Sequence, residues 1–283
     1  MTDILKRFDL TGKTAAITGG GGDLCGAMAQ ALGGAGVKVA VLDISLEKAE
    51  AAARSVGLAG GTAKALKCNV LDAAELKKCC EEISALWGPP DFLINGAGGN
   101  DPRGSTSVDF QEPAWEGAPP VQSFFDLDPA GFRHVFDLNF MGTFLATQAF
   151  AQGMVAKGGG AIVNISSMSA FMPLTKVAAY SAAKAAVSNF TRWLAVHFAH
   201  TGVRVNALAP GFFMTEQLRF LHIDQKTGEL TPRARQVVAH TPMGRYGEPD
   251  DLIGTLIWLL SDASRFVTGV VVPIDGGFSS YSI

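Results

Sequence analysis

The sequence predicts an α/β fold of the doubly wound type, in which helices cover both faces of a parallel sheet. Short apolar runs rich in β-branched residues alternate with helical stretches along most of the 283 residues. Runs such as GVKVAVLD and GAIVNIS are apolar almost throughout, which is typical of strands buried on both faces. Hydrophobic residues make up 48% of the chain and charged residues 17%, which is enough apolar material for a large core.

Strands and helices are expected in alternation from the N-terminus onward. The expected strands are Lys13–Thr18, Val37–Leu42, Ala63–Cys68, Asp91–Asn95, Ala161–Ser166, Val203–Leu208 and Val270–Ile274. The expected helices are Gly26–Gly34, Leu46–Val56, Ala73–Trp87, Asp128–Lys157, Ala179–His200 and Asp250–Ser261. Right-handed crossovers between parallel strands bring all their carboxyl ends to one edge, which is where such folds bind their ligands.

Two long segments, at about 98–126 and 212–242, interrupt this alternation. The first is rich in proline and glycine, and the second is mixed and polar. Loops this long are often functional, and both follow the ends of expected strands. We therefore expect them to cover a substrate. No internal repeat and no linker between two cores is visible, so residues 1–283 are expected to form a single domain.

The bulk properties argue against several classes of protein. The net charge is −3, so no basic surface indicates nucleic-acid binding. No uncharged apolar run approaches the length of a bilayer span, and the charged N-terminus lacks a signal-peptide core. A cytoplasmic protein is expected. The cysteines show neither a CxxC pair nor a zinc spacing, and His197 and His200 have no acidic partner nearby, so no metal site is expected.

A glycine-rich turn, ITGGGGDLCG, follows the first expected strand directly at Ile17–Gly26. Glycines let the backbone turn tightly and approach a diphosphate, while the next helix presents free N–H groups to that anion. Gly19, Gly22, Asp23 and Leu24 are therefore candidate cofactor-binding residues. Glycine clusters are also common in ordinary turns, which is the alternative explanation.

Asp43 ends the second expected strand, 24 residues after Gly19. An acidic residue at about this distance can accept hydrogen bonds from the ribose hydroxyls of a dinucleotide and would repel a 2′-phosphate. Ile44 and Ser45 supply no cation to bind such a phosphate. NAD is therefore favoured over NADP. Asp43 could also cap the helix that follows, in place of this role or together with it.

Tyr180 and Lys184 are spaced by four residues, so on a helix their side chains lie on one face. A free tyrosine has a pKa near ~10, and a neighbouring ammonium lowers it. Bringing the pKa to about 7–8 requires roughly 3–4 kcal/mol, to which an oxidised nicotinamide would also contribute. Such a tyrosine can donate a proton to a carbonyl oxygen. Ser167, at the end of the fifth strand, could hold the same oxygen. A purely structural pair is the alternative.

These motifs together resemble the classical short-chain dehydrogenase/reductase family over nearly the whole chain. The matching residues are Thr18-Gly19, Asn95–Gly98, Asn139, Ser167, Tyr180, Lys184, Asn206 and Pro210-Gly211. The resemblance implies a Rossmann-type fold with Tyr180 as the catalytic acid/base and Ser167 holding the reacting oxygen. It also implies that Lys184 binds the nicotinamide ribose and lowers the tyrosine pKa, and that Asn139 anchors a water of a proton relay.

The same resemblance implies further cofactor contacts. Asn69 is expected near the adenine, and the segment Pro210–Thr215 near the nicotinamide amide. The residues expected at the cofactor on this basis are Asn69, Val70, Asn95, Ala97, Gly98, Tyr180, Lys184, Pro210, Gly211, Phe213 and Thr215. The chain departs from the family pattern where Asp23 and Cys25 replace two glycines. Because its carboxylate would repel a diphosphate, Asp23 is expected to turn aside and cap the helix that begins there.

The long segments are similar to those of the D-mannonate oxidoreductase (fructuronate reductase) branch of this family. This similarity implies interconversion of D-fructuronate and D-mannonate. Arg103 could bind the substrate carboxylate, and Asn100 and Gln217 could meet its hydroxyls. Met168 and Phe213 would shape the pocket wall. Solvent exposure of the arginine and core packing of the apolar pair are the alternatives.

Two other functions remain open from the sequence. One is a dehydrogenase for another polyol, gluconate or 3-oxoacyl substrate, and the other is a non-catalytic NAD(H)-sensing protein. The family resemblance also implies a homotetramer in which the helices at 128–157 and 179–200 pair across subunits. Apolar residues such as Phe140, Phe144 and Phe190 permit this pairing, although they could equally be internal.

Overall fold

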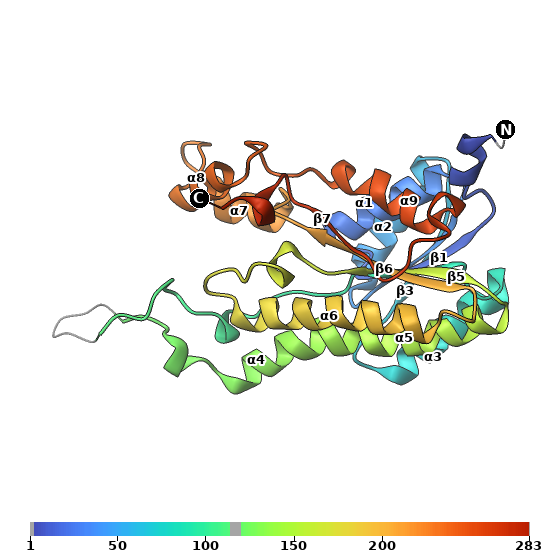
Figure 1. Ribbon diagram of the computed structural model, residues 1–283, viewed down its shortest axis with the longest axis horizontal. Coiled ribbons are helices and arrows are strands. Elements are labelled where there is room, and N and C mark those ends of the chain that lie inside the picture. Colours follow the sequence, from blue (N-terminus) through green and yellow to red (C-terminus); the bar gives the residue numbers. More distant parts are fainter. Residues whose placement is uncertain (1–2, 114–119, 283) are drawn as a thin grey trace.

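A parallel sheet runs through the protein and confirms the predicted fold class (Figure 1). The computed structural model describes residues 3–113 and 120–282, apart from the side chains of Gln217 and Leu221. The sheet has seven strands in the order β3-β2-β1-β4-β5-β6-β7. Their bounds are Thr14–Thr18 (β1), Lys38–Asp43 (β2), Thr62–Lys67 (β3), Phe92–Asn95 (β4), Gly160–Ile165 (β5), Val203–Pro210 (β6) and Val271–Ile274 (β7).

The strand register aligns the carboxyl ends of the central strands. Thr18 at the end of β1 lies opposite Leu42 of β2 and Asn95 of β4, and Asn95 lies opposite Asn164 of β5. The strand order reverses between β1 and β4, because β2 and β3 lie on one side of β1 and the later strands on the other. In open α/β sheets a ligand binds at the carboxyl edge beside such a reversal.

Helices form one layer on each face of the sheet (Figure 1). One layer contains α1 (Asp23–Gly34), α2 (Leu46–Leu58) and α9 (Ile253–Leu260). The other contains α3 (Ala73–Trp87), α4 (Pro129–Phe136), α5 (Gly142–Ala156) and α6 (Ala178–His197). Successive strand residues face opposite layers, so that Ile17 lies in the first core and Ala16 in the second. The four cysteines are free, and three of them are buried.

The helix expected at 128–157 is present as one continuous helical stretch over residues 129–156, but it contains a π-helical turn that the sequence did not predict. Asp128 caps α4 by accepting a hydrogen bond of 2.8 Å from the Ala130 amide. After Phe136 the chain forms a π-helical turn at Asp137–Met141, and α5 follows directly. π-Helical turns inside helices are rare and are frequent at functional sites. This one contains Asn139, a predicted catalytic residue.

The polar segment at 212–242 was expected to be a loop, but it contains two short helices. They are α7 (Glu216–His222) and α8 (Pro232–His240), capped by the hydroxyls of Thr215 and Thr231. A small apolar cluster of Ala234, Val237 and Tyr246, separate from both main cores, holds the segment together. Helices of seven and nine residues give too few turns for a clear apolar period.

The other long segment, at 98–126, forms short 3₁₀ turns at Pro102–Gly104 and Phe124–Asp126. Its residues 114–119, which include Trp115, lie outside the described residues. Within the part of the chain that is described, every helix is too short or too polar to cross a membrane.

Candidate active site

Tyr180 and Lys184 lie one turn apart near the start of α6, as the spacing predicts. The Lys184 ammonium nitrogen lies 5.5 Å from the centre of the Tyr180 ring. Ser167, two residues beyond β5, presents its hydroxyl to the hydroxyl of Tyr180. The structure therefore brings together a phenol, an alcohol and an ammonium at the carboxyl edge of the sheet. A carbonyl oxygen held between the two hydroxyls could accept a proton from the phenol.

Burial sets the acidity of the two ionisable groups in opposite directions. It raises the pKa of Tyr180 above its ordinary value, and the hydrogen bond with Ser167 offsets this only partly. Burial also lowers the pKa of Lys184 to about 8. Desolvation therefore penalises both charged forms in the protein without its cofactor. The expectation that Lys184 and an oxidised nicotinamide together lower the tyrosine pKa stays a prediction.

The ammonium of Lys184 is held in place beneath the site. The side chain is 3% exposed, and Nζ donates a hydrogen bond of 2.7 Å to the Ile165 carbonyl oxygen at the end of β5. A Cβ atom at Gly98 would lie 3.2 Å from this nitrogen and 2.5 Å from the side-chain oxygen of Asn139. Only glycine at position 98 therefore leaves room for both side chains.

Asn139 is fully buried in the π-helical turn. Its amide nitrogen donates hydrogen bonds of 2.7 Å to the carbonyl oxygens of Gly99 and Val135, and its oxygen accepts one of 3.3 Å from the Gly99 amide. The side chain therefore fixes the turn that follows β4. The predicted role of Asn139 in holding a relay water stays a prediction.

A buried polar network supports this region from the side of α5 and α6. Asn95 donates hydrogen bonds of 2.9 Å to Thr147 and 2.8 Å to Asn164, and Asn164 donates one of 2.9 Å to Thr191. The network joins β4 and β5 to α5 and α6. Asn95 therefore orders the strand ends beneath the site, in line with its expected position beside the cofactor.

The glycine-rich turn packs closely against the turn after β4. Gly19 has a φ of +63°, and a Cβ there would lie 2.8 Å from the Cα of Ala97. The Thr18 hydroxyl accepts hydrogen bonds from the amides of Gly96 and Ala97. Cys25, where the family has a glycine, places its buried sulfur in the space above Gly96. Burial raises the pKa of this thiol to about 12, so it is uncharged.

Asp43 connects the end of β2 to the glycine-rich turn. Its carboxylate accepts hydrogen bonds of 3.0 Å from the amides of Gly21 and Ser45. A side chain at Gly21 would collide with Lys48 and lie 3.0 Å from this carboxylate, so glycine keeps the turn open. Ser45 caps α2 through its hydroxyl. Asp43 thus ends β2 beside a glycine turn, an arrangement that fits the adenosine end of a dinucleotide.

The remaining predicted cofactor residues line the ends of β3 and β6. Asn69 accepts a hydrogen bond of 3.0 Å from the Leu71 amide, and Val70 is buried beneath α5. The Gly211 amide donates a hydrogen bond of 2.9 Å to the carbonyl oxygen of Ile274, which holds the end of β6 against β7. The hydroxyl of Thr215 caps α7, and the ring of Phe213 is buried. Their contacts with a cofactor stay predictions.

The carboxylate of Asp23 lies elsewhere than expected. Gly22 is the capping residue of α1, and Asp23 is the first residue of that helix. The Asp23 carboxylate accepts a hydrogen bond of 2.6 Å from the backbone amide of Glu216, at the start of α7. The prediction that Asp23 caps its own helix is therefore wrong, because its carboxylate accepts a hydrogen bond from the amide of Glu216 instead.

Comparison with known proteins decides the family. A family model described as enoyl-(acyl carrier protein) reductase matches residues 24–279. A solved short-chain type dehydrogenase/reductase from Mycobacterium marinum is 30% identical, with a TM-score of 0.83 over 98% of this chain and 99% of that one. The chain belongs to the short-chain dehydrogenase/reductase family.

Two more similar proteins fall within the same family of short-chain dehydrogenases. An oxidoreductase of Bacillus subtilis, UxuB, described as uncharacterized, is 53% identical over 275 residues, which are 97% of each chain. A solved structure from Haemophilus influenza is 46% identical, with a TM-score of 0.91 over 97% of each chain. It is described as a candidate D-mannonate oxidoreductase with bound NAD.

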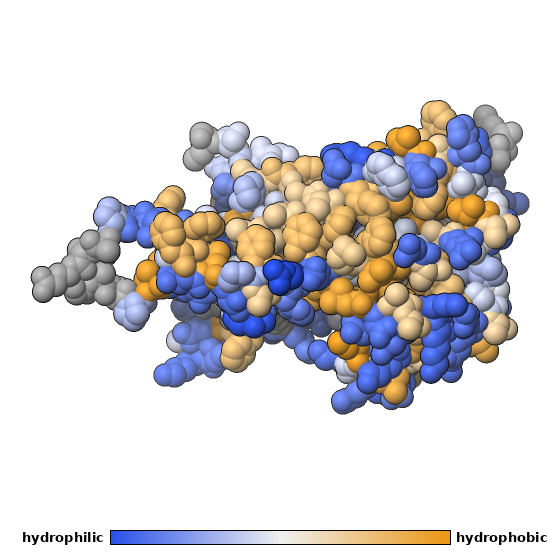
Figure 2. All heavy atoms as spheres, turned by 90° about the horizontal axis from the view of Figure 1, so that it is seen from below, coloured by the Kyte–Doolittle hydropathy of each residue, from blue (hydrophilic) through white to orange (hydrophobic). Residues whose placement is uncertain are grey.

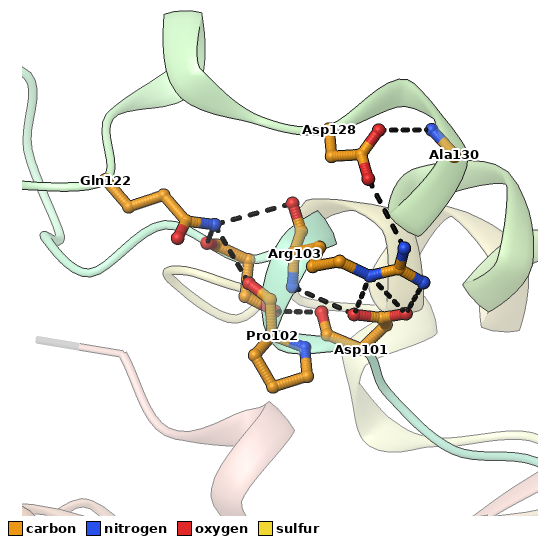
Figure 3. Close-up of polar contacts among 7 residues, drawn as sticks. Asp101, Pro102, Arg103, Gln122, Asp128 and Ala130 are labelled. Atoms are coloured by element: carbon orange, nitrogen blue, oxygen red, sulfur yellow. Dashed lines mark hydrogen bonds and ion pairs between the residues drawn. The ribbon is translucent and has the colours of Figure 1, made fainter.

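Arg103 of this short-chain dehydrogenase pairs with the chain's own carboxylates (Figure 3). Its Nη2 atom lies 2.7 Å from Asp101, and its Nη1 atom lies 3.5 Å from Asp128, the capping residue of α4. The hydrogen bonds from Arg103 lower the pKa of Asp101 to about 2. The predicted contact of Arg103 with a substrate carboxylate stays a prediction, because its guanidinium is paired within the chain here. The guanidinium holds the 98–126 segment against the start of α4.

The other predicted substrate residues have mixed outcomes. Asn100 donates a hydrogen bond of 2.9 Å to the Ser105 hydroxyl, and Met168 is buried just after Ser167. The side chain of Gln217 lies outside the described residues. For all three, contact with a substrate stays a prediction.

The C-terminus of the short-chain dehydrogenase also reaches the site, which the sequence did not indicate. The turn Phe278–Ser280 packs beside the turn Met168–Ala170, directly after Ser167. Asp275 holds this C-terminal turn by accepting hydrogen bonds of 2.9 Å from the amides of Gly277 and Ser279. The segment DGGFSS, an acid followed by glycines and serines, was the available signal for a tight turn.

Proposed function

We propose that this enzyme interconverts D-fructuronate and D-mannonate with NAD(H). The similarity to the NAD-bound Haemophilus structure, over almost the full length of both chains, is the observation that supports this proposal. The site agrees with it, because Ser167, Tyr180 and Lys184 form a group suited to reducing a carbonyl.

NAD is the cofactor, and it supplies or accepts the hydride. The glycine-rich turn with Gly19, Gly22 and Leu24 would bind the diphosphate, and Asp43 would accept hydrogen bonds from the adenosine ribose. Lys184 takes the nicotinamide ribose. These assignments agree with the tight backbone turn that the glycines allow and with the carboxylate of Asp43 at the end of β2.

In reduction, Ser167 donates a hydrogen bond to the keto oxygen of the substrate and Tyr180 transfers its proton to that oxygen. The raised pKa of Tyr180 keeps the phenol protonated at neutral pH, which suits this direction. The reverse reaction requires the phenolate, which the ammonium of Lys184 and the oxidised nicotinamide stabilise electrostatically. The turn at Met168–Ala170 and the C-terminal turn at Phe278–Ser280 form the adjoining wall.

An NADH-consumption panel tests the proposed substrate. D-Fructuronate is expected to give a kcat/KM at least about tenfold above a keto-gluconate or an acetoacetyl thioester, since a site built to hydrogen-bond particular hydroxyls strongly rejects analogues that lack them. Preferred turnover of a keto-gluconate or a thioester would support the second enzyme function instead. If the protein binds NADH but none of these substrates leads to NADH oxidation, the result would support a non-catalytic NAD(H)-sensing protein.

Replacement of Asp43 by alanine is expected to raise the Kd for NADH about tenfold and to reduce the preference for NADH over NADPH. The change removes a charged acceptor at the ribose and the repulsion of a 2′-phosphate. Fluorescence titration with both cofactors measures this. Asp43→Asn is the control, because it keeps an acceptor for the Gly21 amide but loses the charge. An unchanged ratio of the two Kd values would contradict the assignment.

A homotetramer is part of the proposal, and an apolar face on the side of α4–α6 supports it (Figure 2). Aromatic rings stack on one another along α6. The ring centres of Phe190 and Trp193 are 6.0 Å apart, and those of Trp193 and His197 are 4.6 Å apart. Trp193 is 56% exposed, and a groove of about 330 Å³ lies between α5 and α6. Contiguous apolar surface of this kind is typical of an interface.

Trp193→Glu is expected to reduce the assembly to dimers or monomers in sedimentation velocity, because a charge would be buried without a partner. Leu58→Glu, at a more exposed apolar position on α2 in the opposite layer, is the control and should leave the mass unchanged. An unchanged mass of the Trp193→Glu variant would show that subunits do not meet through this face.

A further inference from the structure

One hydrogen bond joins the glycine-rich turn to the segment across the cofactor site from it. The Asp23 carboxylate oxygen lies 2.6 Å from the backbone nitrogen of Glu216, 193 residues away in the chain. We call residues 214–246, which contain α7 and α8, the lid segment. Among the residues that the structure describes, this is the only hydrogen bond or ion pair between the lid segment and residues 3–210.

The lid segment is a compact unit with an apolar cluster of its own. Its apolar cluster of Ala234, Val237 and Tyr246 is separate from the two main cores, and His222 Nδ1 lies 2.7 Å from the Tyr246 hydroxyl. Both ends of the segment meet where Phe213 pairs with Gly247. Two chain crossings side by side can serve as a hinge about which a compact segment turns. The lid segment also contacts the C-terminal part of the chain, where the Met243 amide donates a hydrogen bond of 3.1 Å to the Gly276 carbonyl oxygen and the His240 ring packs against Phe278.

The negative charge of Asp23 lies close to the place where the cofactor diphosphate is proposed to bind. It is the first residue of α1, directly after the glycines that take the cofactor diphosphate in the proposed function. A carboxylate there repels a diphosphate, and a glycine would avoid this cost. The hydrogen bond with Glu216 gives the carboxylate a donor on the far side of the site, at the segment that follows Pro210 and Gly211.

We propose that Asp23 is a positioning residue that holds the lid segment closed over bound NAD(H) and so slows release of the cofactor. This inference rests on the proposed position of the cofactor between the glycine-rich turn and the segment after β6. The cofactor must leave between these two parts of the chain. Opening the lid segment therefore requires breaking the hydrogen bond between Asp23 and Glu216.

Three substitutions separate this role from that of the charge alone. Asp23→Ala removes both charge and acceptor, whereas Asp23→Asn removes the charge and keeps an acceptor oxygen. Glu216→Pro removes the donor from the other side. Proline suits this position, because Glu216 is the first residue of α7 and Thr215 before it is already extended, with a φ of −89° and a ψ of 165°.

Stopped-flow chase of bound NADH measures the release rate. Release is expected to be about tenfold faster in Asp23→Ala and in Glu216→Pro, since a hydrogen bond to a charged group is worth about 1.4 kcal/mol or more. Asp23→Asn is expected to stay within about threefold of the parent protein. The Asp23→Ala/Glu216→Pro double variant should release NADH no faster than either single variant, because both changes break the same bond.

Hydrogen exchange of the cofactor-free protein provides a readout that does not depend on the proposed function. The Glu216 amide is expected to exchange faster in Asp23→Ala but not in Asp23→Asn. Unchanged exchange in Asp23→Ala would overturn the inference. So would slower NADH release in both Asp23 variants, which would make repulsion of the diphosphate the dominant effect. Failure of the parent protein to bind NADH would instead overturn the proposed cofactor site.

Discussion

Tyr180→Phe is expected to lower kcat for carbonyl reduction by about 10²–10⁴ while leaving the Kd for NADH within about twofold, because the phenol acts as the proton donor. The substitution removes one oxygen atom and keeps the ring that lies against Lys184. It therefore tests proton transfer without emptying the space beside the ammonium. Steady-state rates and NADH fluorescence titrations measure the two quantities on the same preparation.

Ser181→Ala is the matched control for this variant. Ser181 is the next residue of α6, and its hydroxyl accepts a hydrogen bond of 3.3 Å from the Leu174 amide, away from the reacting group. Loss of that hydroxyl should cost a modest amount of stability and little activity. If Tyr180→Phe kept full activity, another group would have to donate the proton, and the role given to Tyr180 would be wrong.

The fold was predictable because its central strands are nearly continuous apolar runs that are buried on both faces. The sequence also predicted the neighbourhood of Tyr180, Lys184 and Ser167, because helical spacing and the end of a strand determine where those side chains lie. The π-helical turn at Asp137–Met141 was not visible, since one wider turn hardly disturbs the apolar period of a long helix. It took the structure to show that this turn buries Asn139.

The sequence did not reveal which groups the charged side chains pair with. Arg103 and Asp23 are surface residues whose partners, Asp101 and the Glu216 amide, depend on how loops fold back over the site. Sequence spacing identifies neighbours on one helix or strand, but not contacts between loops. The effect of burial on the pKa of Tyr180 was not visible for a related reason. Its direction depends on how deeply the pair is buried, which the spacing of Tyr180 and Lys184 does not reveal.

Lys184→Met is expected to reduce kcat/KM by about 10²–10³, the usual cost of removing one preorganised donor from an active site. Methionine has nearly the length of the lysine side chain, so the space beside Gly98 and Tyr180 stays filled. The Ile165 carbonyl loses its donor, a cost of about 1–3 kcal/mol in the folded state. The loss of activity should appear at saturating NADH as well as at low NADH, if the ammonium acts on Tyr180 and not only on the ribose.

The same substitution changes how stability depends on pH. Burial lowers the pKa of Lys184 from 10.5 to about 8, so between these values the unfolded chain binds more protons than the folded protein. The free energy of unfolding of the parent protein should therefore rise relative to that of Lys184→Met as the pH increases from 8 to about 10.5. The 2.5-unit difference corresponds to a relative gain of about 3 kcal/mol. Urea unfolding of both proteins at pH 7, 8, 9 and 10 measures this, and parallel profiles would show that the ammonium is not buried as described.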